Sequence, residues 1–193
     1  MRKDAAENRD KLLTAARRVF GERGIDATLN DVAREAGVGV GTAYRNFANK
    51  QELLEALFAR QVDELEAILT QCLAMDDPWE CLEYYLRRSL ALQYADHATA
   101  QIFAGRFVSQ AAHDLSRDRM APLVNRVGER CGVPGTDLIL IQIAVLATAD
   151  IMGKGYERYL DLALAGLKTG EKSPIPALTT EELHEATGRG CRD

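Results

Sequence analysis

The sequence lacks the apolar segments that mark secreted and membrane-spanning proteins. Its N-terminus, MRKDAAENRDKLL, carries charges where a signal peptide needs an apolar stretch. The longest uncharged apolar run covers residues 138–149, which is shorter than the roughly 20 residues that a membrane-spanning helix needs. We therefore expect a soluble, cytoplasmic protein that does not associate with a membrane.

Cysteine is sparse, and its spacing fits neither a disulfide framework nor a metal site. The four cysteines are Cys72, Cys81, Cys131 and Cys191. None belongs to a CxxC pair, and no histidine lies at metal-ligand spacing from any of them. A chain of 193 residues can bury a sizeable core without such cross-links. We expect reduced, mostly buried thiols and no bound metal.

The motifs of common enzyme and cofactor sites are also missing. There is no GxSxG sequence and no Cys–His nucleophile arrangement. The run GVGVGT (37–42) has glycine at every second position instead of the GxGxxG spacing, so it does not predict a nucleotide site. The pairs Asp96–His97 and His113–Asp114 point about 100° apart if helical, because a helix has 3.6 residues per turn. We expect no catalytic residue and no cofactor.

Helical periodicity, in contrast, runs through the chain, and no strand pattern persists. We expect an all-α fold of about nine helices. The expected ranges are 9–23, 28–37, 40–46, 49–74, 77–94, 99–107, 107–114, a helix ending at 131, 137–153 and 156–168, with one turn near 180–187. Thr28 with Asp31, and Asn49 with Glu52, fit capping boxes, and Thr136 is expected to cap the helix after it. Pro122 should begin or kink a helix.

The total charge is acidic, but it is unevenly distributed. The formal net charge of −5 argues against nucleic-acid binding, because phosphate contacts need lysine and arginine. Residues 1–60 contain 11 Lys+Arg and 9 Asp+Glu, a net charge of +2, whereas residues 61–193 have a net charge of −7. The first third of the chain is therefore the basic end.

Residues 28–47, TLNDVAREAGVGVGTAYRNF, fit a helix-turn-helix. Gly37 lies at the turn, where a positive φ costs little without a Cβ, and Ala33 offers a small side chain where the two helices would cross. The outward residues of the second helix are Val40, Thr42, Tyr44 and Arg45. These residue types suit contacts with groove edges and phosphates. A helical hairpin that caps an α-bundle would show the same pattern, so both interpretations stay open on the residues alone.

The stretch from Leu12 to Leu57 closely resembles the N-terminal domain of the tetracycline-repressor (TetR) family. The matching elements are Ala15, Ala16, Phe20, Gly24, Thr28, Val32–Val38, Gly41, Thr42, Tyr44, Phe47 and Lys50. A weaker likeness covers residues from about 115 to 187, where YERYLDLALAGLK (156–168) looks like one subgroup of TetR-type regulators.

The resemblance implies a repressor that binds double-stranded DNA at a palindromic operator as a homodimer and is released by a small-molecule effector. Residues 1–48 would form the DNA-binding domain, and residues 49–193 would bind the effector and dimerise through helices 137–153 and 156–168. The implied DNA contacts are Thr28, Val40, Gly41, Thr42, Tyr44, Arg45 and Lys50, with Thr28 and Lys50 on phosphates. The pocket candidates for an apolar or aromatic effector are Tyr94, Phe103, Phe107 and His113.

Two residues depart from the family pattern. Gly39 stands where serine is usual, so the second short helix lacks its usual side-chain cap. Ala43 stands where a larger apolar residue is common, which thins the packing against the first helix. Both departures concern local rigidity.

Alternatives remain at this point. Residues 137–152 are apolar on almost every face, which fits a dimer interface but also a fully central helix. An α-helical enzyme that uses His113, and a helical adaptor that has lost DNA binding, are the other two functional hypotheses.

Overall fold

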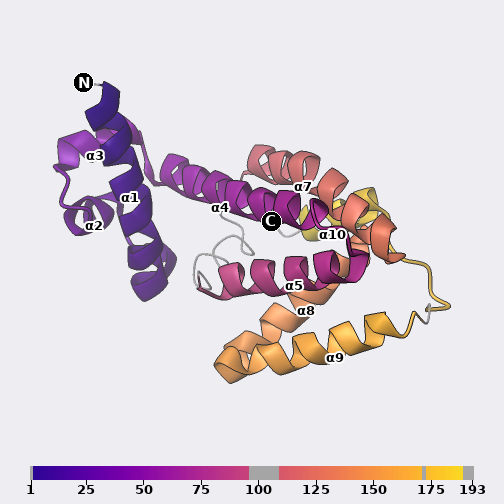
Figure 1. The fold of residues 1–193 in the computed structure, drawn as a ribbon. Coiled ribbons are helices and arrows are strands. Elements are labelled where there is room, and N and C mark those ends of the chain that lie inside the picture. Colours follow the sequence, from indigo (N-terminus) through magenta and orange to yellow (C-terminus); the bar gives the residue numbers. More distant parts are fainter. Residues whose placement is uncertain (1, 96–108, 171–172, 189–193) are drawn as a thin grey trace. The chain divides into compact units, whose positions relative to one another are not determined.

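The computed structural model describes residues 2–95, 109–170 and 173–188, and every regular element in these ranges is helical (Figure 1). The predicted all-α fold is thus confirmed, with nine α-helices in the described ranges. Contacts divide the chain into two compact units, and two of the boundaries fall inside helices, between Gln61 and Val62 and between His113 and Asp114. Each unit is described by itself below.

The first unit, here called the head, is built from α1 (Arg2–Arg23), the short 3-10 turn η1 (Gly24–Asp26), α2 (Leu29–Glu35), α3 (Val40–Asn46) and the first half of α4 (Lys50–Leu73). Helices α1, α2 and α3 contact one another. Their shared core consists mainly of Leu12, Ala16, Phe20, Leu29, Val32, Ala33, Ala43, Phe47, Leu53 and Leu57. Ala33 and Ala43 are completely buried, so small side chains occupy the positions where these short helices meet.

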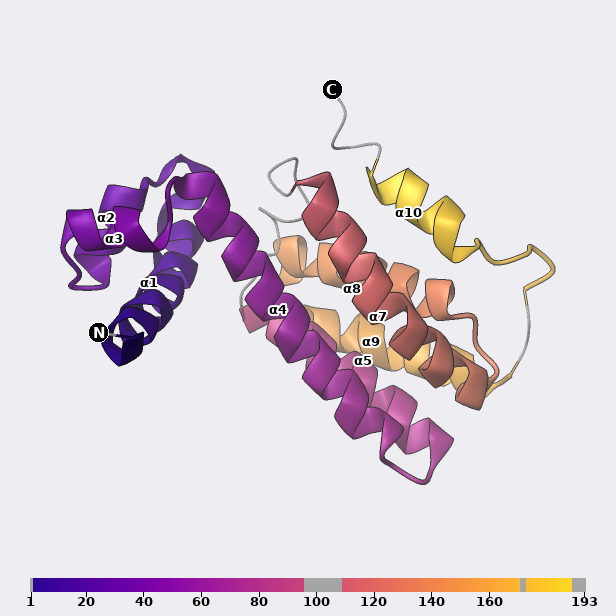
Figure 2. The same cartoon turned by 90° about the horizontal axis from the view of Figure 1, so that it is seen from above.

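The second unit contains the second half of α4 with α5 (Pro78–Ala95), α7 (Gln110–Cys131) from Asp114 onward, α8 (Gly135–Met152), the 3-10 turn η2 (Gly153–Gly155), α9 (Tyr156–Lys168) and α10 (Thr180–Gly188) (Figure 2). Helix α8 packs against both α5 and α9. The core of the second unit is formed chiefly by Leu69, Leu82, Leu86, Leu90, Val124, Val127, Leu138, Val145, Tyr156, Leu160 and Leu164.

A small polar network lies inside this second core. The amide of Gln142 accepts a hydrogen bond from the Ser89 hydroxyl (2.6 Å) and donates one to the Tyr85 hydroxyl oxygen (2.9 Å). Burial raises the pKa of Tyr85 to about 12, so the phenol stays protonated at neutral pH. Because each polar group in this network has a partner, the core accommodates Gln142 without an unsatisfied amide.

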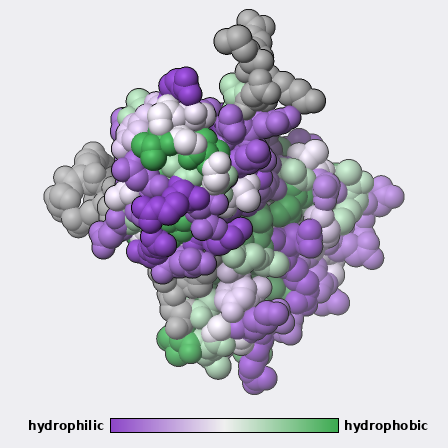
Figure 3. All heavy atoms as spheres, turned by 90° about the vertical axis from the view of Figure 1, so that its left-hand side faces the viewer, coloured by the Kyte–Doolittle hydropathy of each residue, from purple (hydrophilic) through white to green (hydrophobic). Residues whose placement is uncertain are grey.

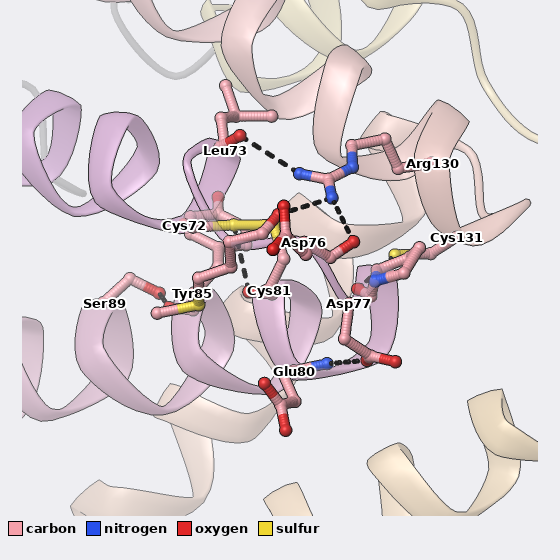
Figure 4. Close-up of a disulfide and its surroundings, with 12 residues drawn as sticks. Cys72, Leu73, Asp76, Asp77, Glu80, Cys81, Tyr85, Ser89, Arg130 and Cys131 are labelled. Atoms are coloured by element: carbon pink, nitrogen blue, oxygen red, sulfur yellow. Dashed lines mark hydrogen bonds between the residues drawn. A yellow bond between two sulfur atoms is a disulfide. The ribbon is translucent and has the colours of Figure 1, made fainter.

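The thiols differ from the sequence-based expectation. Cys72, in the last turn of α4, forms a disulfide with Cys81, in the first turn of α5 (Figure 4). The expectation of reduced thiols was wrong for this pair because the tight α4–α5 hairpin brings the two Cα atoms to 4.6 Å across nine positions of sequence. Cys131 keeps a free thiol, and Cys191 lies outside the described residues.

Several predicted boundaries also need correction. Thr136 does not cap a helix: α8 begins at Gly135, and the Thr136 hydroxyl donates instead to the Leu178 carbonyl (2.8 Å) in the segment before α10. The separate helix expected near 107–114 is the beginning of α7 from Gln110, and this helix runs through Pro122. Proline leaves the carbonyl four residues earlier without its helical donor, and here that residue, Asp118, is exposed to water.

The segment after α9 packs against α7 within the second unit. Thr179 and Glu182 cap α10 reciprocally, and the His184 ring lies 2.9 Å from the Asp114 carboxylate of α7. Leu183 of α10 is buried as well.

Within the described residues, no single helix combines the length and hydrophobicity required to cross a membrane. A bent pair, Arg117–Cys131 with Gly135–Ala149, meets those limits jointly, by length and composition alone.

Candidate nucleic-acid interface

The turn between α2 and α3 is closed by backbone hydrogen bonds. Gly37 has φ of 65°, and its amide donates to the Arg34 carbonyl (3.2 Å). The Val38 amide donates to the Ala33 carbonyl (3.0 Å). This pair of bonds is the Schellman arrangement, which satisfies the last carbonyls of α2. The sequence predicted a glycine-dependent turn here, and the positive φ of Gly37 confirms it.

The first turn of α2 is held by the predicted capping box. The Asp31 amide donates to the Thr28 hydroxyl oxygen (3.2 Å), and the Thr28 amide donates to the Asp31 carboxylate (3.0 Å). The Thr28 hydroxyl also donates to that carboxylate (2.6 Å). These bonds from Thr28, with smaller contributions from the charges of Arg23 and Arg34, lower the pKa of Asp31 below its usual value. Thr28 itself is exposed at the N-terminus of α2.

Acid should therefore loosen the start of α2. The pKa of the Asp31 carboxyl is lower in the folded protein than in the unfolded chain, where it is about 3.9. The ionised carboxylate therefore stabilises the fold fully above the unfolded pKa, and this stabilisation is lost as the pH falls through the folded pKa. We expect Asp31→Asn to lower the thermal midpoint at pH 6, and this difference from the parent should shrink steadily toward pH 2.5. Asp26→Asn, outside the capping box, serves as the control. A difference that is independent of pH would contradict this role of the Asp31 carboxylate.

Helix α3 has two distinct faces. The Ala43 side chain is completely buried, whereas Val40 and Tyr44 are each 48% exposed. Gly41 and Arg45 are exposed as well, and Thr42 is half-buried. Figure 3 views the molecule from the side that carries α1–α3 in Figure 1, where hydrophilic side chains surround isolated hydrophobic spots. The structure therefore brings the predicted contact residues of α3 to one solvent-facing surface.

Polar bonds within α3 orient part of this surface. The Arg45 guanidinium donates to the Thr42 hydroxyl oxygen (2.8 Å), and the Asn46 amide donates to the Thr42 carbonyl (2.8 Å). A guanidinium has five N–H donors, and this contact with Thr42 uses one of them. The arginine is thus held along the helix with donors left over for a planar acceptor.

An arginine that the sequence analysis did not single out fixes the other end of α3. The Arg9 guanidinium of α1 donates to the Asn46 carbonyl (3.1 Å) and lies 4.3 Å from the centre of the Phe47 ring. A cation at a helix C-terminus bonds a carbonyl that lacks an intrahelical partner and interacts favourably with the helix dipole. No local sequence signal marks this role, because Arg9 and Asn46 are 37 residues apart.

The N-terminus of α3 begins at Gly39 without a side-chain hydrogen bond, as the sequence indicated. The Gly39 carbonyl still accepts from the amides of Thr42 (2.8 Å) and Ala43 (3.0 Å). Its φ is −58°, and an added Cβ would meet only the Thr42 hydroxyl oxygen, at 3.9 Å. Serine therefore fits this position without strain.

We expect Gly39→Ser to stabilise the head by about 0.5–1 kcal/mol, through a better cap and a less flexible unfolded chain. Gly37→Ser is the matched control in the same turn. There the positive φ should make the substitution destabilising by about 1 kcal/mol or more, although nothing crowds the added Cβ. Hydrogen exchange of the α3 amides, together with thermal unfolding, measures both effects. Equal effects of the two substitutions would contradict this account.

Lys50, the first residue of α4, is half-buried and has two partners inside the head. Its ammonium donates to the Ile25 carbonyl of η1 and lies 5.8 Å from the centre of the Phe20 ring. Next to it, the Asn49 side chain caps α4 by accepting from the Glu52 amide (2.9 Å). The Glu52 carboxylate accepts from the Ala48 amide (2.7 Å), one residue earlier than expected. Lys50 therefore ties the start of α4 to the segment that leads into α2.

The structure places one of the four effector-pocket candidates. Tyr94 is half-buried near the end of α5, with its ring centre 4.9 Å from that of Tyr156 in α9. Phe103 and Phe107 lie outside the described residues. His113 belongs to α7, but its side chain is outside the described part of the structure.

The two helices proposed for dimerisation expose apolar side chains on their outer faces. On α8, the buried positions Leu138, Gln142, Val145 and Ala149 form one stripe. The opposite stripe is exposed and consists of Leu140, Ile143, Ala144, Ala147 and Ile151. On α9, Tyr159 and Leu162 are exposed in the same way. A central helix would be buried all round, so the fully central interpretation of α8 does not hold within the single chain.

Known proteins with similar sequences are transcriptional regulators. Residues 12–57 match the family described as bacterial regulatory proteins of the tetR family. The chain is 29% identical over 154 residues to the HTH-type transcriptional repressor BepR of Brucella suis, covering 78% of this chain and 70% of that protein.

Solved structures extend the likeness over most of the chain. A TetR transcriptional regulator from Streptomyces coelicolor has 33% sequence identity and a TM-score of 0.61, covering 82% of this chain and 97% of that one. A TetR-family regulator from Syntrophomonas wolfei shares the fold, with a TM-score of 0.66 at 21% identity over 89% of this chain and 99% of that one.

Proposed function

Because the chain belongs to the TetR family of helix-turn-helix transcriptional regulators, we propose that it binds a palindromic operator in double-stranded DNA as a homodimer and leaves it on binding a small molecule. The proteins to which it is similar are transcriptional regulators and not enzymes. A regulator of this kind acts on bacterial DNA, so we place it in the cytoplasm.

The observation that carries the proposal is the division of α3 into two faces. Its inner face is anchored by Ala43, and its outer face presents Val40, Tyr44 and Arg45. Apolar and aromatic side chains can contact thymine methyl groups in the major groove, while arginine can bond guanine or phosphate. Thr28, exposed at the N-terminus of α2, and Lys50 are proposed phosphate contacts, and Gly41 and Thr42 complete the surface.

The dimer would form through the exposed apolar stripe of α8 together with Tyr159 and Leu162 of α9. Two such helices from each protomer would give a four-helix interface with twofold symmetry. A twofold dimer presents two α3 helices, which must lie about 34–36 Å apart to enter successive major grooves. The symmetry of the protein would then be reflected in a palindromic operator.

The effector would act by shifting a conformational equilibrium. We propose an apolar or aromatic ligand near Tyr94, Phe103, Phe107 and His113. It can weaken DNA binding only through its own preference for a second arrangement of α4, typically about 1–3 kcal/mol.

Selection of bound duplexes from a random pool tests the proposal directly. We expect an enriched site with two inverted half-sites whose centres are about 10–10.5 base pairs apart, or a multiple of that spacing. Failure to enrich any duplex at low salt would refute DNA binding. An enriched site without inverted symmetry would refute the dimer arrangement.

Lys50→Met should weaken binding to the operator and to unrelated duplexes by similar factors. If the ammonium contacts a phosphate, the slope of log K against log salt should fall by about one for each protomer. Arg126→Met removes the same charge from an exposed position in the second unit and should leave the slope unchanged. Weaker binding with an unchanged slope would instead show that Lys50 acts through its bond to the Ile25 carbonyl.

A further inference from the structure

The corner where α4 meets α5 contains a disulfide that DNA binding does not explain. Cys72 and Cys81 are both completely buried, although the turn between them is largely exposed (Figure 4). The bond closes a short loop between two helices that already share an extensive apolar core, including Leu69, Leu82 and Leu86. A chain with such a core does not depend on a covalent cross-link to fold.

The compartment also argues against a permanent cross-link. On the proposed function, the protein works in the bacterial cytoplasm, where thiols are kept reduced. Disulfides that form there are usually transient and are catalytic or redox-sensing. The Cα spacing of 4.6 Å lets this bond form again after reduction without a rearrangement of the two helices.

Arg130 of α7 holds the turn that connects the two cysteines. Its guanidinium donates to the carbonyls of Leu73 (3.2 Å), Met75 (2.6 Å) and Asp76 (3.0 Å). The neighbouring Cys131 thiol donates to the Pro78 carbonyl (3.0 Å). These bonds satisfy backbone carbonyls from the last residue of α4 to the first residue of α5. Because both cysteines are buried, a reductant reaches the sulfur atoms only after a local opening, and we expect the bonds of Arg130 to slow the opening of this turn.

We propose that Cys72 and Cys81 form a reversible thiol–disulfide modification site that adjusts operator affinity through α4. Reduction needs a dithiol, such as a thioredoxin-like protein or dithiothreitol. One thiolate of the dithiol attacks a sulfur of the bond and forms a mixed disulfide. The second thiol then displaces the remaining protein sulfur. Cys72 and Cys81 together gain two electrons and two protons, and the dithiol becomes a disulfide; a small-molecule disulfide reverses the exchange.

The coupling to DNA follows from the continuity of α4. This helix runs without interruption from Lys50, in the head, to Leu73, next to the cross-linked corner. When the disulfide is closed, the last turn of α4 is covalently fixed to the first turn of α5. When it is reduced, the same turn can shift against α5. The last turn of α4 can therefore shift relative to α5 in the reduced protein but not in the oxidised protein.

The modification site is tested without DNA. After purification without reductant, alkylation under denaturing conditions should label two of the four thiols, and all four after dithiothreitol treatment. Cys131→Ala should keep the disulfide, whereas Cys72→Ala and Cys81→Ala should lose it. Arg130→Met should speed reduction by dithiothreitol at least fivefold, and Arg126→Met should not. Four reactive thiols in the oxidised parent would overturn the site; an unchanged rate in Arg130→Met would overturn the role of Arg130.

The coupling is tested with the operator obtained by selection. Typical coupling between sites predicts that the oxidised and reduced proteins differ in operator affinity by about fivefold or more. This difference should vanish in Cys72→Ala and Cys81→Ala and persist in Cys131→Ala, with circular dichroism confirming that each variant is folded. A smaller difference in the parent would overturn the coupling and leave a structural cross-link. Absence of DNA binding in both states would refute the proposed function and the coupling with it, while the thiol count would still decide the modification site.

Discussion

Tyr44→Ala should reduce operator affinity by about thirtyfold or more. The Tyr44 ring is 48% exposed on the outer face of α3, and a dimer would use it in both half-sites. A good base contact contributes about 1–3 kcal/mol, so two symmetric losses amount to about 2–6 kcal/mol. Fluorescence anisotropy with the selected operator measures the effect, and unrelated duplexes should lose much less.

The stability of the Tyr44→Ala variant separates recognition from packing. Surface substitutions usually change the free energy of unfolding by less than about 0.5 kcal/mol, so the thermal midpoint should hardly change. Tyr44→Phe keeps the ring and shows how much of the loss depends on the hydroxyl. A variant that unfolds early or no longer dimerises would identify Tyr44 as a packing residue instead of a DNA contact.

Ile143→Glu should break the dimer. Ile143 is 51% exposed in the middle of the outer stripe of α8, and twofold symmetry would bury two carboxylates in one interface. Burying an unpaired charge costs several kcal/mol, and about 3 kcal/mol already raises the dimer Kd more than a hundredfold. Analytical ultracentrifugation over a range of concentrations measures this Kd directly. Operator affinity should fall in parallel, because in the proposed complex each protomer contacts one half-site.

Leu115→Glu is the matched control for this experiment. Leu115 lies on α7, outside the proposed interface, and at 45% it is exposed to a similar degree. The same change of side chain there should leave the dimer intact. If Leu115→Glu dissociates the dimer and Ile143→Glu does not, the interface lies on α7 and not on α8 and α9.

The helix-turn-helix could be predicted from sequence because its signals are local. Thr28 and Asp31 are three residues apart, and both bonds of their capping box form as expected. The glycine at the turn marks a positive φ that few other residues adopt. Burial of Ala43 follows from helical spacing. Each of these predictions depends on residues within a few positions of one another, where geometry is nearly fixed.

Contacts between distant residues could not be predicted in the same way. Nothing near Thr136 reveals that its hydroxyl bonds to Leu178 instead of capping α8. Lys50 was assigned to phosphate by resemblance, and its bond to the Ile25 carbonyl depends on how η1 packs against α4. CxxC spacing gives no sign of the disulfide, because a helical hairpin here joins cysteines nine positions apart.

The apolar character of α8 was informative but ambiguous. Its sequence shows no polar face, and that pattern fits both a central helix and an interface helix. The structure separates the two by showing which positions α5 and α9 already cover. The sequence shows that α8 has no polar stripe, and the structure shows that Ile143 and Ile151 are exposed.

The two faces of α3 also bear on how this regulator can evolve. Ala43 and the adjoining Phe47 maintain the fold, while Val40, Tyr44 and Arg45 project from it. If α3 reads the operator as proposed, mutations at the projecting positions would alter the preferred DNA sequence with little effect on folding. A duplicated copy of this gene could therefore acquire a new target site through a few substitutions in one short helix. Its inherited core would remain unchanged throughout that divergence.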